Sequence, residues 1–308
     1  MPEGHSVHRI ANLLRELFLD HEVSASSPQG RFREGAALVS GSTILGIEAI
    51  GKQLFIQWEK ERWLRVHLGI YGAWDIATRD SLRGLSGASS RRSLGAPRVR
   101  KMGEHDALRE ALEVFPPEPV GQVRLRLQTD DALADLRGPT VCEVLSPDEV
   151  DSVRARLGPD PVYDKGRKGA DVFASRVGKT TRPIGIVLMD QSVVSGIGNV
   201  YRAELLFRHR MDPFRRAHTL DRSEIDALWH DWSALLADGI ATGVMMTRND
   251  LTKSQRVVAL KNTRERYFVY RRHGQPCRVC GTPIVMAEMA ARKLYLCPNC
   301  QKSTGSVS

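Results

Sequence analysis

The sequence has no apolar run that approaches the about 20 residues of a membrane-spanning helix, so no membrane partner is expected. The first residues also lack the charged and then apolar pattern of a secretory signal. Cysteine is scarce: the chain contains five, and four of them cluster near its C-terminus. In a reducing compartment such a cluster favours a metal site over disulfide bonds. These absences predict a cytoplasmic protein, and without a dimerisation motif we expect a monomer.

Acidic residues are too few to balance the basic ones. The 45 Lys and Arg residues outnumber the 36 Asp and Glu residues, which gives a net charge of +9 and a pI near 9.5. This excess favours a polyanionic partner, most simply nucleic acid, and the alternative is a basic soluble protein without such a partner. Nucleic-acid binding would associate the protein with the nucleoid of a bacterium. The length of 308 residues and the hydrophobic content of 42% suit two ordinary domains.

An N-terminal domain over residues 1–138 is expected to be a β-sandwich or barrel with a leading helix. Apolar side chains recur at helical spacing through residues 5–19, which predicts a helix that anchors the N-terminus. Strand-like patterns occupy segments 43–50, 53–58, 63–68 and 123–129. Residues 79–104 are rich in Ser, Gly and Arg, a composition that predicts a mobile loop or a weakly ordered insertion.

A helical domain is expected over residues 139–265. Ser146 and Pro147, followed by two acidic residues, are typical of a helix start with Ser at the N-cap. Helical patterns occupy segments 150–157, 170–175, 184–189, 200–209, 223–239 and 256–270. The remaining segment, 266–308, is short, Cys-rich and strand-prone. The predicted fold class is therefore α+β with several domains.

The C-terminal cysteines form two Cys-x-x-Cys pairs separated by sixteen residues: Cys277, Cys280, Cys297 and Cys300. Two such knuckles fit one tetrahedral Zn²⁺, for which thiolates are suitable ligands. Four protein ligands leave no open coordination position, so the zinc is expected to be structural. The intervening residues would form a hairpin. With Arg278, Arg292 and Lys293 it would make a small basic knuckle suited to phosphate contact, unless Arg292 is an ordinary surface charge.

The chain begins Met1-Pro2-Glu3. Removal of Met1, which the small Pro2 side chain would favour, would leave a proline secondary amine as the first group. An N-terminal amine titrates near about pH 7.7–8.0, so a useful fraction is uncharged near pH 7 and can attack a carbonyl-like carbon. The iminium that results carries a fixed positive charge and draws electrons from the next bond. Glu3 is a candidate proton donor or acceptor beside it. The alternative is a proline without a catalytic role, since many chains have proline at this position.

A turn containing Gly196 and Gly198 leads through Asn199 into an expected helix. The glycines allow the backbone to approach another surface, and the free N–H groups of a helix start favour a phosphate. The spacing differs from a dinucleotide fingerprint, and no strand precedes the turn. A helix–turn–helix element built here would hold a DNA backbone rather than read bases. An ordinary helix cap is the alternative.

These residues together resemble the formamidopyrimidine-DNA glycosylase / endonuclease VIII family, and within it bacterial endonuclease VIII-like members. The motifs that carry the resemblance follow the family's order along the whole chain: Pro2-Glu3-Gly4, Gly51-Lys52, His67-Leu68-Gly69, Leu157-Gly158-Pro159-Asp160-Pro161, Gln191 with Gly196-Ile197-Gly198-Asn199, and the four cysteines with Arg292. The resemblance implies an N-terminal β-sandwich, a helix–two-turns–helix domain and a zinc finger, with DNA in the cleft between them.

The resemblance also implies an activity: excision of an oxidised base, and then cleavage of the strand at the abasic site, in base excision repair. Pro2 would attack the sugar C1′ and form a Schiff base, and Glu3 would assist opening of the sugar ring. Lys52 would reach a phosphate beside the lesion. β-Elimination followed by δ-elimination would break the strand. Arg292 would complete the catalytic set by gripping a phosphate near the flipped nucleotide.

The remaining contacts implied by the resemblance concern DNA binding. Asn199 would grip a phosphate, and Gln191 belongs to the same turn. Ile70 and Tyr71 stand where relatives insert wedge residues into the base stack, although core packing is the alternative for both. Arg137 lies in a loop similar to the one that faces the orphaned base in purine-specific members, but the aromatic residue that follows it there is missing.

Some residues depart from the family pattern. Ser6 stands where the family often has a second glutamate, and Leu294 where relatives commonly have threonine. The Pro2-Glu3-Gly4 start and Arg202-Ala-Glu after the glycine turn favour the branch that acts on oxidised pyrimidines, and the missing aromatic after Arg137 disfavours the purine-specific branch. The alternatives are the same chemistry on oxidised purines, a non-catalytic zinc-finger DNA-binding protein, and an enzyme of RNA or free nucleotides. Both double- and single-stranded DNA remain possible partners.

Overall fold

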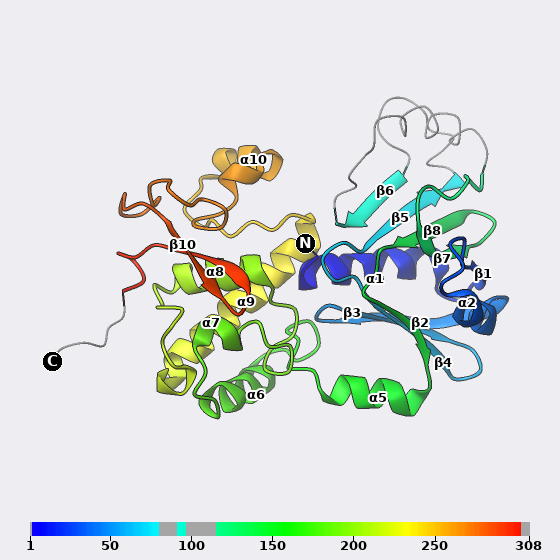
Figure 1. The fold of residues 1–308 in the computed structure, drawn as a ribbon, viewed down its shortest axis with the longest axis horizontal. Helices are drawn as coiled ribbons and strands as arrows, with labels where there is room; N and C mark the ends of the chain where they lie inside the picture. Colours follow the sequence, from blue (N-terminus) through cyan, green and yellow to red (C-terminus); the bar gives the residue numbers. More distant parts are fainter. Residues whose placement is uncertain (1, 80–90, 97–114, 303–308) are drawn as a thin grey trace. The chain divides into compact units, whose positions relative to one another are not determined.

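The structure of the protein is a computed structural model that describes residues 2–79, 91–96 and 115–302 (Figure 1). Two units divide the chain, Met1–Ala155 and Arg156–Ser308. No helix in the described ranges is sufficiently long and apolar to cross a bilayer. The elements of the first unit are α1 (Gly4–Phe18), β1 (Glu22–Ser26), α2 (Arg33–Val39), β2 (Ser42–Ile50), β3 (Gln53–Trp58), β4 (Arg62–His67), β5 (Ala73–Thr78), β6 (Arg91–Gly95), β7 (Val123–Gln128), β8 (Ala132–Arg137), β9 (Val141–Leu145) and α5 (Pro147–Ala155).

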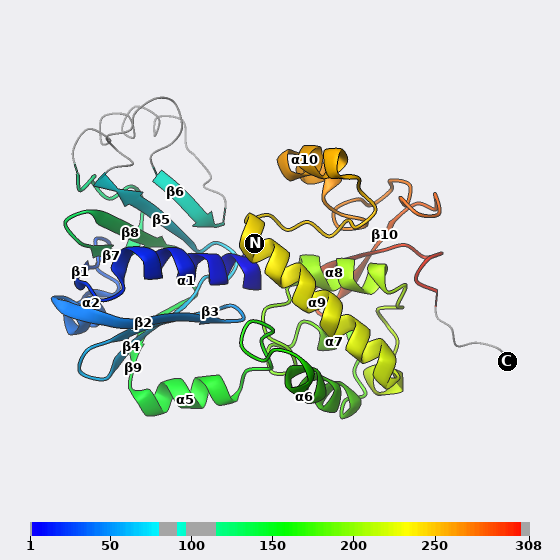
Figure 2. The same ribbon diagram turned by 180° about the vertical axis from the view of Figure 1, so that it is seen from behind.

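The strands of this unit form one antiparallel sheet that folds into two layers. Their hydrogen-bonded order is β6-β5-β8-β7-β1-β2-β3-β4-β9. Glu22 and Val23 of β1 pair with β2, whereas Ser24, Ala25 and Ser26 pair with β7, so β1 passes from one layer to the other. Figures 1 and 2 show α1 between the layers, with β5, β7 and β8 on one side and β2, β3 and β4 on the other. The expected sandwich with a leading helix is confirmed.

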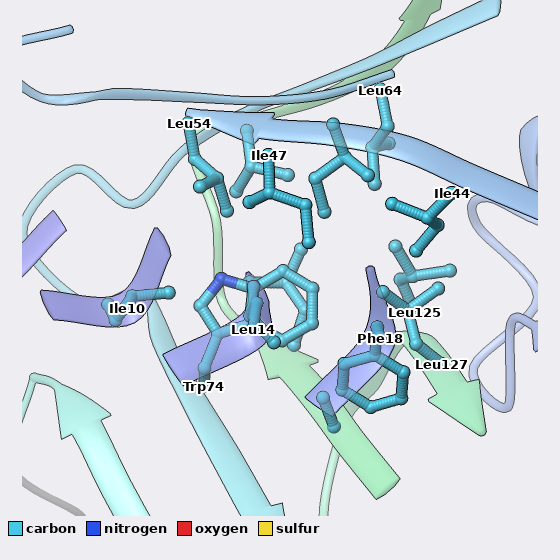
Figure 3. Close-up of a cluster of buried hydrophobic side chains, with 14 of the residues drawn as sticks. Ile10, Leu14, Phe18, Ile44, Ile47, Leu54, Leu64, Trp74, Leu125 and Leu127 are labelled. Carbon is cyan, nitrogen blue, oxygen red and sulfur yellow. The ribbon is translucent and has the colours of Figure 1, made fainter. Parts of the chain in front are cut away.

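The core of the first unit surrounds α1. An apolar stripe on this helix recurs every three or four residues and is at most 1% exposed: Val7, Ile10, Leu14 and Phe18. Figure 3 shows Ile10, Leu14 and Phe18 between residues of both layers, such as Leu54 on one side and Trp74 on the other. Burial of each such side chain contributes about 1.5–3 kcal/mol. The stripe therefore holds α1, and with it the N-terminus, in a defined position.

Part of the loop expected over residues 79–104 is a strand. β6 pairs with β5 in antiparallel register, with Gly95 opposite Ala73. The expectation of a loop is wrong for these residues, because the open edge of β5 supplies backbone partners that a Ser-, Gly- and Arg-rich composition does not reveal. Residues 80–90 and 97–104 lie outside the described part of the chain.

Residues 139–155, which we expected in the helical domain, belong to the first unit. β9 extends the sheet by pairing with β4, and Val141 lies opposite His67. The division between units falls after Ala155, whereas the sequence pattern changes after residue 138. Long-range strand pairing places this segment, and composition does not report such pairing.

The second unit contains most of the helices and a small hairpin. Its elements are α6 (Arg167–Gly178), α7 (Ile184–Val187), α8 (Asn199–Arg208), η1 (Ala217–Thr219), α9 (Arg222–Thr242), α10 (Lys253–Lys261), η2 (Thr263–Glu265), β10 (Val285–Met289) and β11 (Arg292–Leu296). The aromatic rings of Phe173, Tyr201, Trp229 and Trp232 pack in its main core. A reciprocal cap between Asp221 and Glu224 begins α9, and a similar one between Ser146 and Glu149 begins α5.

The hairpin of β10 and β11 projects Arg292 from a tight turn. Ala290 and Ala291 connect the strands, and both have positive φ, 51° and 55°. Two consecutive residues of this kind are typical of a type I′ turn, which matches the twist of the flanking strands. Arg292 is the first residue after the turn and pairs with Met289.

Candidate functional site

The N-terminus lies at the same edge of the first unit as the β2–β3 turn. Figure 3 shows Ile10 and Leu54 at one end of the core cluster, and Phe18 and Ile44 at the other. α1 therefore begins at the end of the sandwich where β2 turns into β3. Lys52 is in that turn, between Ile50 of β2 and Gln53 of β3.

Strand register brings two further loops to this edge. Gln53 pairs with His67, so the segment that follows β4, residues 68–72, starts beside Lys52. In the other layer, Ala73 at the start of β5 pairs with Arg137 at the end of β8. The register thus gathers Lys52, the 68–72 loop and Arg137 along the edge of the sandwich at which α1 begins.

Pro2 and Glu3 are both buried at the start of α1. Glu3 is the N-cap residue and is 0% exposed. Its carbonyl oxygen accepts hydrogen bonds from the N–H groups of Ser6, at 2.9 Å, and Val7, at 3.4 Å. The first turn of α1 thereby fixes the backbone that carries the Glu3 carboxyl. If Met1 is removed, this buried carboxyl is next in sequence to a proline amine and is suited to proton transfer in a site shielded from water.

Two histidines follow on the first turns of the same helix. His5 is 5% exposed and His8 is 4% exposed. Burial lowers the pKa of His5 to about 4, and the positive charge of Arg9 adds to the shift. His5 is therefore neutral at physiological pH. Its Nε2 lies 3.2 Å from the hydroxyl of Ser6, which is the residue that departs from the family's second glutamate.

His67 is a site residue for which sequence reasoning assigned no role. Burial lowers the pKa of His67, and the positive charges of Lys52 and Arg65 lower it further. The N–H of Gly69 donates to His67 Nδ1 over 3.2 Å, so the other ring nitrogen, Nε2, carries the proton of the neutral ring. His67 lies near Lys52 because Gln53 pairs with His67 in the sheet, and a linear sequence motif does not contain this strand register.

Ile70 and Tyr71 extend from this edge into solvent. Ile70 is 49% exposed and Tyr71 is 80% exposed, so the alternative of core packing is excluded for both side chains. A large aromatic side chain with this exposure is a candidate for contact with a partner. The backbone behind it is closely packed, because a Cβ atom on Gly138 would lie 3.3 Å from the carbonyl oxygen of Tyr71. The wedge role itself stays a prediction.

Arg137 is engaged within the sheet. Its guanidinium donates two hydrogen bonds to the carboxylate of Asp75 on β5, at 2.5 and 3.1 Å. Asp75 is 3% exposed, and its cross-strand neighbour on β8, Asp135, forms a similar bidentate pair with Arg126 of β7. Paired guanidinium and carboxylate groups of this geometry hold each other strongly. The expected DNA contact of Arg137 stays a prediction, and it would compete with this ion pair.

Gln191 braces the glycine turn of the second unit. Its amide nitrogen donates to the carbonyl oxygens of Met189 and Ile197, at 3.1 and 3.0 Å, and its amide oxygen accepts from the N–H of Gly196 at 3.0 Å. The side chain therefore shapes the loop before α8. These hydrogen bonds are all within the protein, and the expected DNA contact of Gln191 stays a prediction.

Asn199 is the first residue of α8, with Gly198 as its N-cap. Asn199 is 7% exposed, and its Nδ2 donates a 2.9 Å hydrogen bond to the carbonyl oxygen of Lys293 in β11. Arg202 donates to Asn199 Oδ1. Arg292, next to Lys293, is exposed at the hairpin tip. The structure thus brings the helix start and the arginine-bearing strand together within one unit, by contacts that the sequence pattern did not indicate.

The four expected zinc ligands converge. The Sγ atoms of Cys277, Cys280, Cys297 and Cys300 all lie within 4.8 Å of one another. Their separations are 3.9 Å for Cys277–Cys300 and 3.5 Å for Cys280–Cys297, close to the about 3.8 Å between ligands of a tetrahedral Zn²⁺ with Zn–S bonds of about 2.3 Å. Main-chain N–H groups of Val279 and Cys300 approach Sγ atoms at 3.5 and 3.4 Å, which suits thiolates. The donor set fits one structural Zn²⁺.

Three family models match consecutive parts of the chain. A formamidopyrimidine-DNA glycosylase N-terminal domain matches residues 1–139, and a formamidopyrimidine-DNA glycosylase H2TH domain matches residues 157–250. A zinc finger found in FPG and IleRS matches residues 274–302. The three matches follow one another along the chain and include the Pro2-Glu3-Gly4 start, the glycine turn before α8 and the four cysteines.

Relatives and solved structures agree with these matches. Endonuclease 8 1 of Mycobacterium tuberculosis is 39% identical over 302 residues, which is 98% of this chain and 100% of the relative. Formamidopyrimidine-DNA glycosylase of Geobacillus kaustophilus is 36% identical over 148 residues, 48% of this chain and 52% of the relative. The fold is similar to Lactococcus lactis Fpg in complex with DNA containing an abasic site, with a TM-score of 0.70, 23% identity, and coverage of 98% of this chain and 100% of that chain.

Proposed function

Because the chain belongs to the formamidopyrimidine-DNA glycosylase / endonuclease VIII family of DNA glycosylases and abasic-site lyases, we propose that its Pro2 amine is the nucleophile of this activity. One observation supports the assignment most directly. The strand register of the first unit gathers Lys52, His67 and the exposed Tyr71 along a single edge of the sandwich, and α1 begins at the same edge. A nucleophile, a buried acid, a cation and an aromatic side chain are the groups that base excision requires.

The reaction proceeds in steps that the residues of this edge can carry. The uncharged Pro2 amine attacks C1′ of the damaged nucleotide, the base leaves, and the amine and the sugar form an iminium. Glu3 donates a proton to the ring oxygen of the sugar as that ring opens. The iminium acidifies the C2′ proton, and loss of this proton breaks the bond to the 3′ phosphate. A second elimination releases the 5′ phosphate, and water then frees the amine.

The phosphate contacts of the proposal come from both units. Lys52 neutralises a phosphate beside the lesion, and neutral His67 can donate a hydrogen bond from Nε2. Arg292 and the N-terminus of α8 at Asn199 grip further phosphates, because a guanidinium and a helix start both favour anions. Ile70 and Tyr71 enter the stack left by the flipped base. The structural Zn²⁺ supplies no chemistry and holds the hairpin that carries Arg292.

Oxidised pyrimidines are the favoured lesions in this proposal. Arg137, which would face the orphaned base, is tied to Asp75, and no aromatic residue follows it. The same chemistry on oxidised purines is the second candidate. The partner is damaged or abasic DNA, double- or single-stranded, on the bacterial nucleoid, and the protein acts as a monomer. A panel of single-lesion oligonucleotides, each against the four opposite bases, ranks these substrates by single-turnover rate.

Borohydride trapping tests the nucleophile. The enzyme with a processed N-terminus, incubated with an abasic-site duplex and borohydride, is expected to yield a covalent adduct whose sugar fragment maps to Pro2 by mass spectrometry. Pro2→Gly should lower adduct formation and base excision by at least about 100-fold, since it replaces the secondary amine. Glu3→Gln should abolish excision of an intact lesion while some cleavage of preformed abasic sites remains.

The same experiment separates the proposal from a non-catalytic DNA-binding protein. A binding protein retains affinity for the duplex but leaves no reduced adduct. An adduct attached to a lysine in place of Pro2, or near-normal trapping by Pro2→Gly, contradicts the assigned nucleophile. His21→Asn, a change at an exposed histidine near the far end of α1, is the matched control and should trap as the wild type does.

A further inference from the structure

A single buried arginine links three elements of the second unit. Arg202, one turn into α8, donates to Asn199 Oδ1 and to the carbonyl oxygen of Lys293 in β11 over 3.4 Å. It also donates to the carbonyl oxygen of Gly185 in α7 over 3.4 Å. The two carbonyl contacts are at the long end of the hydrogen-bonding range. Together with the bond to Asn199, they connect one guanidinium to α7, α8 and β11.

Arg202 is 0% exposed and is among the largest fully buried side chains of the described residues. A guanidinium away from water costs several kcal/mol unless its donors are satisfied. A side chain chosen for packing alone would be apolar at this position. A planar guanidinium can instead hold several acceptors at fixed angles, which neither an apolar side chain nor lysine can reproduce.

The acceptor on β11 lies beside a residue of the proposed DNA contact. Asn199 and Arg202 hold the same carbonyl oxygen, that of Lys293, and Arg292 precedes Lys293 in the strand. On the other strand of the hairpin, Met289 packs in a small apolar cluster with Ile186 of α7. The backbone on both sides of the hairpin tip is therefore fixed to the helical part of the unit, and the side chain of Arg292 is exposed beside it.

We propose that Arg202 is a positioning residue for phosphate binding. It holds β11 against the start of α8, so that Arg292 and the N–H groups of that helix start meet the same stretch of DNA backbone. This inference rests on the proposed function, because it takes Arg292 and the α8 N-terminus as phosphate contacts. Arg202 itself touches no DNA and takes no part in bond making or breaking.

A purely structural role for Arg202 makes a different prediction, so coupling to Arg292 is the decisive measurement. The experiment is a double-mutant cycle of Arg202→Met, Arg292→Ala and the double variant, all in the full-length zinc-loaded protein. The dissociation constant is measured for a duplex that contains a tetrahydrofuran abasic-site analogue. The single-turnover rate of borohydride trapping at saturating enzyme is measured in parallel, so that an effect on the chemical step is distinguished from an effect on binding.

The matched control is Arg208→Met at the other end of α8. Arg208 is also largely buried, and it pairs with Asp231 through two hydrogen bonds of 2.7 and 2.6 Å, with no bond to β11 among the contacts described. Its loss should lower the thermal unfolding midpoint. The DNA dissociation constant of the folded protein should change less than about 2-fold, because the Lys293 contact is intact.

If Arg202 acts through Arg292, each single variant should weaken binding about 10-fold, the value of one well-placed charged contact. The double variant should then bind within about 2-fold of Arg292→Ala alone. Arg202→Lys keeps the positive charge but lacks the planar guanidinium with its several donors, and it should bind DNA as weakly as Arg202→Met. It also replaces Arg202→Met in the cycle if the methionine variant fails to fold.

Two results contradict the inference without affecting the proposed function. The first is wild-type DNA affinity in Arg202→Met. The second is a double variant that binds about 100-fold more weakly than the wild type, the product of two 10-fold losses in the single variants, because the two residues would then act independently. Restoration of full affinity by lysine also overturns it, since charge rather than geometry would then suffice. Wild-type affinity in Arg292→Ala removes the phosphate role of Arg292 from the proposed function, and the inference fails with it. Trapping by Pro2 is measured separately and remains informative about the nucleophile in every case.

Discussion

His5 shows at the scale of one residue how burial changes the chemistry of a side chain. The sequence places it three residues after the proposed nucleophile but gives no indication of its environment. In the structure its imidazole is nearly inaccessible to water, and its pKa falls to about 4. The folded protein therefore disfavours the protonated form, whereas the unfolded chain protonates this histidine near pH 6.5.

The stability of the protein should consequently fall in mild acid. Between pH 6.5 and about 4 the unfolded state binds a proton at His5 that the folded state does not, so the free energy of unfolding decreases as pH is lowered through this window. The full loss from this group is about 3 kcal/mol and is reached only below about pH 4. Urea midpoints of the wild type and His5→Asn at pH 7.5 and 5 measure it.

His5→Asn should flatten the pH dependence, and the exposed His21→Asn should leave it as steep as in the wild type. Equal pH slopes in the wild type and His5→Asn would show that this histidine accepts a proton without penalty. Other groups titrate in the same range, and the comparison between variants cancels their contribution.

Arg137 and Gln191 illustrate the limit of motif reasoning for single residues. Both belong to segments that resemble DNA-facing loops, and both side chains are occupied inside the protein, by Asp75 and by the loop before α8 respectively. A motif records which residue types occur at which spacing. Whether a polar side chain bonds to a group inside the protein depends on neighbours that are distant in sequence.

At the scale of elements, α8 carries two buried charged side chains that connect it to other parts of the second unit, and Arg202 is the first of them. A second polar side chain on it, Glu204, is 0% exposed and accepts four hydrogen bonds. The donors are the main-chain N–H groups of three consecutive residues and one hydroxyl, at 2.5 to 2.9 Å: Phe268, Val269, Tyr270 and Thr247. Thr247 follows α9, and the other three precede the zinc knuckle. One carboxylate thus joins both ends of the segment that carries α10.

Glu204→Gln should destabilise the second unit by about 3–5 kcal/mol. A buried amide retains one acceptor oxygen, and its NH₂ group would face main-chain donors that have no other acceptor of equal strength. Thermal or urea unfolding measures the change, with the exposed Glu288→Gln on β10 as the control expected to shift stability by less than about 0.5 kcal/mol. A Glu204→Gln protein as stable as this control would mean that water or a rearranged loop satisfies the donors.

At the scale of the whole molecule, the positive charge is unevenly distributed along the chain. Residues 156–308 contain 25 Lys and Arg against 14 Asp and Glu, whereas residues 1–155 contain 20 against 22. The net charge of +9 therefore originates entirely in the second unit. Electrostatic attraction to DNA should depend mainly on this unit, whereas the proposed nucleophile and acid, Pro2 and Glu3, belong to the first unit.

The salt dependence of DNA binding tests this division. The slope of the logarithm of the DNA association constant against the logarithm of the salt concentration should become shallower by about 0.9 in Arg292→Ala. One phosphate contact and the counterion that it releases are lost in this variant. Lys60→Gln removes one exposed positive charge from the β3–β4 turn, at the opposite end of β3 from Lys52, and should leave the slope unchanged. A slope that responds equally to both changes would indicate that net charge alone governs binding.

Local patterns in the sequence were sufficient for several features. Helical spacing of apolar residues predicted α1 to within one residue at each end, because the stripe that faces the core repeats within the helix itself. Two Cys-x-x-Cys pairs predicted the zinc knuckle, because each pair alone sets the spacing of two ligands. The order of the motifs indicated the family, which the comparisons confirmed over nearly the whole chain.

Only the tertiary structure decided which distant segments meet. The strand β6 within a Ser- and Gly-rich segment, the assignment of β9 to the first unit, and the convergence of Lys52, His67 and Tyr71 on one edge all follow from strand register. The buried roles of Arg202 and Glu204 follow from partners more than forty residues away in sequence. Sequence periodicity reports a residue's near neighbours, whereas pairing between remote strands and the satisfaction of buried charges are settled by the packing of the folded chain.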